Sequence, residues 1–264
     1  MFKGDYNFFD YKYNIVGYNG QDYGGLAQYL YLIIVIVLLV ILLMYFKKTS
    51  KEKVLKIIKY LSVFLVIFYL SKTTWESIYD IKYSGSFNTG LLPFDSCSMI
   101  MLAGIIASFT KGKLKDYSLS WIATGSIVGG IATVISLNAF KYYPFFSFGA
   151  SYSMIWHFLM IFMGLLLIIT NSVEISYKTI IKGFIFHLIV SLFIIPIDYI
   201  FNFDFMMYKD LGSIPIFEDI ATKLTNNGLG FINPIMMLLL YFLAFNIIYL
   251  LFFLTKKFYQ KRKI

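Results

Sequence analysis

The sequence predicts an all-α membrane protein, a polytopic helix bundle with about seven transmembrane helices. The chain of 264 residues is 59% hydrophobic and 14% charged, with a mean hydropathy of +0.74. Soluble domains have roughly 45–50% apolar and 25% charged residues. Seven apolar segments approach the length of about 20 residues that a membrane span needs. Basic residues gather in alternate connections between those segments, as they do in membrane proteins with a fixed orientation.

The seven expected spans follow one another with short connections. In lipid every backbone polar group must be satisfied within the chain, so each span is expected to be a helix. The third begins near Pro93 and ends before Lys111. The segments are 27–46, 57–79, 92–110, 118–138, 151–171, 180–201 and 233–255.

Lysine placement predicts the orientation. Sixteen of the 23 basic residues fall in the connections on one side and in the C-terminal tail, and seven fall on the other side. Because basic residues favour the cytoplasmic side, the N-terminus is predicted outside and the C-terminus inside. The sequence thus predicts a multi-pass protein of the cell membrane. It has an extracellular segment at 1–26, a transmembrane domain at 27–255 and a basic cytoplasmic tail at 256–264.

The longest predicted loop, 202–232, contains a short amphipathic stretch. Residues 215–224 have apolar side chains at helical spacing and acidic residues in the first turn, which is typical of a helix lying at the membrane interface. The lysines lie between spans rather than on one face, so we expect membrane lipids and no nucleic acid as partners. The single cysteine cannot form an internal disulfide. No pattern suggests a metal or an organic cofactor, and none predicts the oligomeric state.

Several ionisable side chains are predicted to lie inside the membrane, where they are energetically unfavourable and often functional. Most of them fall in the predicted outer half. Lys72 and Glu76 are spaced to form an ion pair on one helix face, and Asp198 is close enough to a helix end to reach the headgroups. His187 is expected nearer the cytoplasmic leaflet as a packing histidine. The candidates for substrate binding are Asp198, Glu76 and Lys72.

A possible catalytic group combines Cys97, His157 and Asp95. Asp95 and Cys97 are expected in the first turn of the third span, at a depth compatible with His157. A helix N-terminus and a nearby histidine both favour the reactive thiolate. A nucleophile, a base and an orienting carboxylate are the parts of an acyl-transfer site. Residues two apart on a helix point in different directions, so the spacing alone does not establish such a site.

The stretch from Leu92 to Ser98, Leu-Pro-Phe-Asp-Ser-Cys-Ser, resembles the Leu-Pro-Leu-His-Leu-Cys signature of the YwaF-like family. Those are bacterial seven-helix proteins related to eukaryotic transmembrane protein 164. Further similar stretches follow in the family's order between about residues 50 and 255. They are Trp75-Glu76, Trp121 through Ala132, Tyr143-Pro144-Phe145, Trp156-His157, Phe203 through Tyr208, Leu229-Gly230 and Pro234.

The resemblance implies a role for two residues. The eukaryotic relative is regarded as a membrane acyltransferase that carries the acyl group on the signature cysteine. This implies Cys97 as the acyl-carrying nucleophile and His157 as its base. Asp95 stands where the family has a histidine, and Asp204 stands where it has an asparagine.

Three functions remain open from the sequence. The first is a lipid acyltransferase or hydrolase that uses Cys97, His157 and Asp95 in the outer half of the membrane. The second is a channel or transporter in which the same polar side chains line an outer vestibule. The third is a structural membrane protein without catalysis.

Overall fold

The computed structural model describes residues 6–12, 15, 18, 20, 22–87, 89–136, 138–209 and 218–261. In these ranges all regular structure is helical. The chain forms two compact units. Unit 1 consists of Met1–Leu91 and Gly129–Ser172, and unit 2 consists of Leu92–Val128 and Val173–Ile264. Helix α5 (Gly125–Ser136) continues from unit 2 into unit 1.

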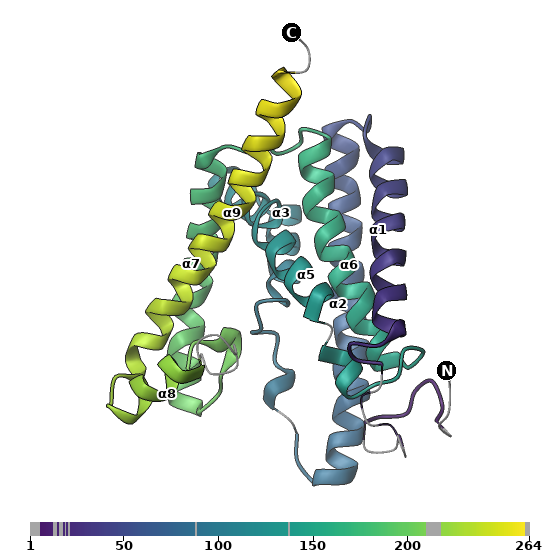
Figure 1. Cartoon of the computed structure of the whole chain (residues 1–264), viewed down its shortest axis with the longest axis vertical. Helices are drawn as coiled ribbons and strands as arrows, with labels where there is room; N and C mark the ends of the chain where they lie inside the picture. The colour runs from purple at the N-terminus through teal and green to yellow at the C-terminus, as the bar shows by residue number, and fades with distance from the viewer. Residues whose placement is uncertain are drawn as a thin grey trace. The chain divides into compact units, whose positions relative to one another are not determined.

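Unit 1 is built on three long helices, α1 (Leu26–Phe46), α2 (Lys51–Ser84) and α6 (Phe148–Ile169). Helix α6 packs against both α1 and α2 (Figure 1). The side chain of Ser147 accepts a hydrogen bond from the Ala150 amide and so caps the start of α6. Two short 3-10 helices, Thr89–Leu91 and Asn138–Lys141, complete the unit.

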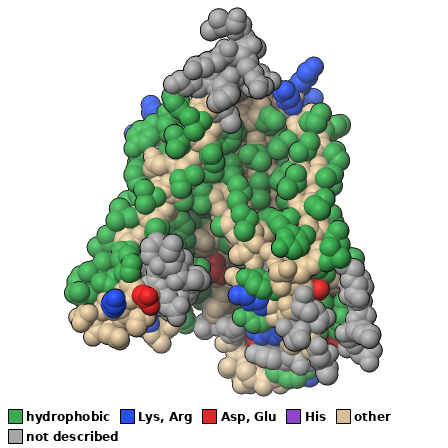
Figure 2. All heavy atoms as spheres, viewed as in Figure 1, with side chains coloured by type: hydrophobic (Ala, Val, Ile, Leu, Met, Phe, Trp, Pro, Cys, Tyr) green, Lys and Arg blue, Asp and Glu red, His purple; other side chains and the backbone are tan. Residues whose placement is uncertain are grey.

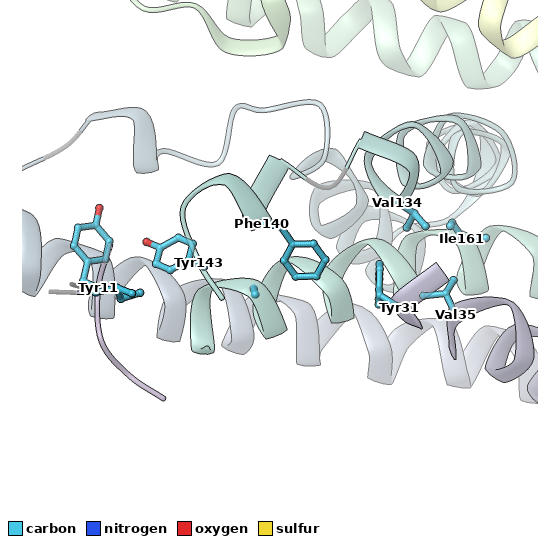
Figure 3. Close-up of a cluster of buried hydrophobic side chains, with 9 residues drawn as sticks. Tyr11, Tyr31, Val35, Val134, Phe140, Tyr143 and Ile161 are labelled. Atoms are coloured by element: carbon cyan, nitrogen blue, oxygen red, sulfur yellow. The ribbon is translucent and has the colours of Figure 1, made fainter. Parts of the chain in front are cut away.

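The core of unit 1 is a cluster of buried aromatic and branched side chains from the N-terminal segment and the helices. Figure 3 shows Tyr31 and Val35 of α1 beside Val134 and Ile161, with Phe140, Tyr143 and Tyr11 further along. The N-terminal segment is held in place by hydrogen bonds. The Tyr11 hydroxyl donates to Asp80 Oδ1 at 2.9 Å, and the Trp75 indole donates to the carbonyl of Phe9.

Unit 2 contains α3 (Met99–Phe109), α4 (Gly112–Ile122), α7 (Tyr177–Phe201), α8 (Glu218–Asn226) and α9 (Asn233–Lys261). Helix α4 packs against both α3 and α7, and α7 packs against α9. The close approach of α4 and α7 depends on Gly183. A β-carbon there would come within 2.6 Å of Thr124 Oγ1 and 3.1 Å of the Ser120 carbonyl oxygen.

Six helical segments of the described chain are long and apolar enough to cross a membrane, which supports a multi-pass membrane protein. They are Leu26–Phe46, Lys51–Ser84, Gly112–Lys141, Phe148–Ile169, Tyr177–Phe201 and Gly230–Leu254. Hydrophobic side chains cover the visible flanks of α1 and α9 (Figure 2). The orientation across the membrane stays a prediction.

The predicted third span, 92–110, is wrong in length. Its helix, α3, has 11 residues and at 1.5 Å per residue is about 16 Å long, roughly half of the hydrocarbon core. The residues before it form turns, in which the Phe94 amide donates to Leu92 and the Ser98 amide to Asp95. Pro93 lacks an amide hydrogen, and aspartate and serine favour turns, which accounts for the late helix start.

The predicted fourth span and the predicted interfacial helix also differ in detail from the structure. The expected span 118–138 is interrupted between α4 and α5. The interfacial helix expected at 215–224 appears as α8, Glu218–Asn226, and residues 210–217 lie outside the described residues.

Candidate functional site in unit 2

Cys97 lies in the turn that precedes α3, two residues before the first helical residue. The expectation that it belongs to the first turn of a helix beginning near Pro93 is therefore wrong. The thiol forms no disulfide and is only partly buried. The unsatisfied amides at a helix start carry partial positive charge, which interacts favourably with an anion.

The turn containing Cys97 reaches the side of α9 at Tyr241. The side chain of Ser96 lies close to the Tyr241 hydroxyl. Cys97 and Asp95 both lie close enough for their charges to act on the same hydroxyl. Phe94 packs edge-to-face on Phe205 with ring centroids 5.3 Å apart, which fixes the other end of the turn.

His187 of α7 packs against Tyr241 and belongs to a closed ring of hydrogen bonds. The centroids of the His187 imidazole and the Tyr241 phenol ring are 4.1 Å apart, and the exposed fraction of His187 is 1%. Its Nε2 atom lies 3.2 Å from the Tyr208 hydroxyl, which also contacts the hydroxyl of Ser191. Ser191 in turn donates to the carbonyl of His187 at 2.8 Å.

The donor and the acceptor of each bond in this ring of hydrogen bonds follow from the number of hydrogens that each group carries. The Ser191 hydroxyl has one hydrogen and gives it to the carbonyl of His187, so its oxygen accepts from Tyr208. Tyr208 has then used its hydrogen and must accept from Nε2–H of His187. A neutral imidazole has one N–H, so Nδ1 of His187 carries the lone pair. This buried Nδ1 has no hydrogen-bond partner among the described side chains.

Tyr208 can join this ring of hydrogen bonds because the chain reverses its direction after α7. Asn202 ends the helix with φ 57°, and its amide bonds to the carbonyl of Asp198. The buried carboxylate of Asp198 accepts the Phe205 amide at 3.0 Å. Met206 and Met207 follow with φ 58° and 61°. Left-handed backbone is strained for such residues and is often found at functional sites. Burial raises the pKa of Tyr208, so its hydroxyl keeps its proton.

Asp198 is buried, whereas Asp95 is exposed. The structure fully buries Asp198, one of whose oxygens stabilises the chain reversal while Oδ2 has no hydrogen-bond partner among the described residues. Asp95 is exposed in the turn, and its carbonyl oxygen accepts the Ser98 amide. Asp95 as orienter and Asp198 as substrate ligand both stay predictions.

His157, Lys72 and Glu76 belong to unit 1. The ion pair predicted between Lys72 and Glu76 is confirmed. His157 of α6 is buried, and its Nδ1 lies 2.7 Å from the carbonyl oxygen of Ser153. A carbonyl only accepts, so Nδ1 carries the hydrogen and Nε2 is the basic nitrogen. The pairing of His157 with Cys97 joins residues of different units and stays a prediction.

Tyr241, Tyr208 and Ser191 were missed at the sequence level, and His187 was assigned a packing role only. The missing information was the chain reversal that brings Tyr208 beside residues 17 and 21 positions earlier. Asn202 carried a weak signal, because asparagine tolerates the left-handed conformation that such a reversal needs. Among the residues that the structure describes, no group of three or more His, Cys, Asp or Glu side chains is arranged to hold a metal ion.

Long apolar helices with polar side chains buried inside them define a multi-pass helical membrane protein. The model of the TMEM164 family matches residues 23–256, and the chain belongs to that family. No curated protein and no solved structure matches the chain. The finer resemblance to YwaF-like proteins remains a resemblance.

Proposed function

We propose that the protein is a membrane lipid acyltransferase or hydrolase in which Cys97 is the nucleophile. The observation that carries the proposal is the position of this thiol. Cys97 is partly accessible, precedes a helix start, and lies beside Tyr241, on which the buried His187 packs. Thiols in electropositive, partly exposed surroundings are the reactive ones, whereas fully buried thiols are inert.

The proposed acyl transfer has two steps. A base takes the proton from Cys97 Sγ, the sulfur attacks the carbonyl carbon of a lipid ester, and the carbon–oxygen bond breaks to release the alcohol with that proton. The acyl group is then held as a thioester on Cys97. In the second step an acceptor alcohol or water attacks the thioester, loses its proton to the base and restores the thiol.

His187 is the base that unit 2 itself offers. Its Nδ1 lone pair is buried and unpartnered among the described residues, while Nε2–H is fixed by Tyr208. The hydrogen-bonded partner thus orients the ring and sets its tautomer, as in other histidine bases. The Tyr241 ring and the Ser96 hydroxyl connect the neighbourhood of His187 with that of Cys97.

His157 is the second candidate base. The resemblance implies it, and the carbonyl of Ser153 fixes its ring so that Nε2 is basic. Asp95 would orient or charge-stabilise the imidazole. Lys72, Glu76 and Asp198 are the proposed polar contacts of the lipid, and α8 would shape lipid entry from the predicted outer interface.

The test is acyl exchange between phospholipids by the purified full chain in lipid nanodiscs. Cys97→Ala is expected to abolish exchange, and Cys97→Ser to lower it strongly because an alkoxide forms less readily than a thiolate. His187→Gln and His157→Gln separate the two candidate bases, since only the true base lowers the rate by the roughly 10²–10⁴-fold that acid–base catalysis supplies. Unchanged exchange in Cys97→Ala would rule out the proposal.

Transport is the second candidate function, and buried polar atoms favour it. Asp198 Oδ2 and His187 Nδ1 lie in α7 without hydrogen-bond partners among the described residues. Such groups inside a membrane often mark a solute or proton path. Flux into vesicles that is lost in Asp198→Asn and retained in Cys97→Ala would favour transport over acyl transfer.

A further inference from the structure

Unit 1 has an apolar cavity of about 670 Å³ among α1, α2 and α6, and it is open on the side of its exposed lining residues. This volume lies within the range of roughly 300–1,000 Å³ found for small-molecule sites. Tyr31 and Val35 line it; both are buried and belong to the core cluster drawn in Figure 3, and they are called its floor below. The Tyr31 hydroxyl already donates to the carbonyl of Met154 at 2.8 Å, so the floor requires no polar partner from a ligand.

The walls of the cavity suit a flexible hydrocarbon better than a packed helix. Close helix packing in membranes uses small residues such as glycine, alanine and serine. Ser151 is the only small side chain in this lining; the others include Ile34, Leu61, Phe64 and Met154. Bulky side chains hold a neighbouring backbone away, whereas an acyl chain can adapt to the space between them.

The length of the cavity along α6 fits one leaflet. Its lining runs from Ser151 to Leu159 on this helix and also includes Phe145 and Phe146, which precede α6. Eight residues at 1.5 Å each give about 12 Å. Half of a hydrocarbon core is about 15 Å thick.

Lys72 lies near the cavity without lining it, joined to the lining by packed aromatic rings. Phe64, in the lining, stacks on Phe68, and Phe68 packs on Tyr152, with ring centroids 5.3 Å and 4.6 Å apart. The ammonium of Lys72 lies over the Tyr152 ring at 5.6 Å. In the Lys72–Glu76 pair the lysine is the more exposed partner, with 24% of its side chain accessible against 11%. Of the two paired groups, the ammonium is therefore the one that is more accessible to a lipid headgroup.

We propose that this cavity binds one acyl chain of a membrane phospholipid, with the lipid phosphate at Lys72. An apolar cavity in membrane-spanning helices, a length that matches one leaflet and a nearby lysine are together complementary to this ligand. The site is in unit 1 and does not involve Cys97; Lys72 is the residue that it shares with the proposed contacts of the lipid substrate.

Photolabelling of the full chain in phosphatidylcholine nanodiscs tests the site. The probe is a phosphatidylglycerol with a diazirine in one acyl chain, and mass spectrometry locates the adducts. We expect adducts on lining residues such as Leu61 and Met154. Ile34→Trp fills the cavity and should weaken these adducts about tenfold, because each expelled methylene loses its burial. Ile36→Trp is the matched control, since Ile36 lies on α1 outside the lining and is 59% exposed; it should leave the adducts unchanged.

Lys72→Gln tests the headgroup. It should weaken labelling by the phosphatidylglycerol probe several-fold and leave labelling by a diazirine alkane without a headgroup unchanged. Adducts spread evenly over exposed helix faces, or equal effects of Ile34→Trp and Ile36→Trp, would overturn the proposal. So would a change of oligomeric state in Ile34→Trp without loss of adducts, because a second copy would then occupy the cavity.

Discussion

Replacing Tyr208 with phenylalanine tests the hydrogen-bonded ring in unit 2. The change keeps the aromatic ring and removes the hydroxyl that joins His187 Nε2 to Ser191. A neutral imidazole has one N–H, and Nδ1 has no alternative partner among the described residues. Either tautomer therefore leaves a buried N–H unpaired. An unpaired buried polar group costs about 1–3 kcal/mol, and we expect the free energy of unfolding to fall by that amount.

Reversible unfolding in mixed detergent micelles measures this loss. Tyr199→Phe is the control, because the Tyr199 hydroxyl bonds to the Gly230 carbonyl at an exposed position. It should change the free energy of unfolding by less than about 0.5 kcal/mol. In a His187→Phe background, Tyr208→Phe should have a much smaller effect, since the imidazole N–H is gone. Equal losses with and without His187 would refute the assigned ring.

Two further predictions concern packing and pH. A β-carbon at Gly130 would lie 2.6 Å from Ile161 Cγ1 and 3.2 Å from the His157 carbonyl oxygen, whereas one at Gly129 would meet only the flexible end of Met160. Gly130→Ala should therefore lower the free energy of unfolding by about 1–3 kcal/mol relative to Gly129→Ala, and equal effects would contradict this packing. Burial also raises the pKa of Tyr208 and Tyr143. The folded chain retains phenol protons that the unfolded chain releases near pH 10, so stability is complete below that pH and falls above it. Tyr208→Phe should reduce this alkaline loss, measured as the midpoint of unfolding against pH, and an unchanged slope would argue against the buried hydroxyl.

Apolar runs were sufficient to predict most of the spans. The helices α1, α6 and α7 begin and end within a few residues of the expected bounds, because each run is flanked by polar or turn-forming residues. The Lys72–Glu76 pair followed from helical spacing alone. These features depend on local sequence, so they can be predicted without tertiary contacts.

The start of α3 and the partners of Cys97 could not be predicted in the same way. Leu91, Leu92 and Phe94 extend the apolar run, so hydropathy hides the turns that delay the helix. Tyr241 looks like one more aromatic residue of an apolar span. Its contacts with Ser96 and His187 depend on how α9, α7 and the turn before α3 pack. Tertiary packing of this kind leaves no periodic signal in the sequence.

The most direct test of the central claim is a mass measurement on the peptide that contains Cys97, after incubation of the protein with a phospholipid substrate. If the thiol is the acyl carrier, rapid acid quenching should trap one acyl group on the peptide containing Cys97, and neutral hydroxylamine should release it as a thioester does. Cys97→Ala should show neither the adduct nor acyl exchange. Acyl exchange that proceeds without any adduct on Cys97, or that persists in Cys97→Ala, would contradict the account.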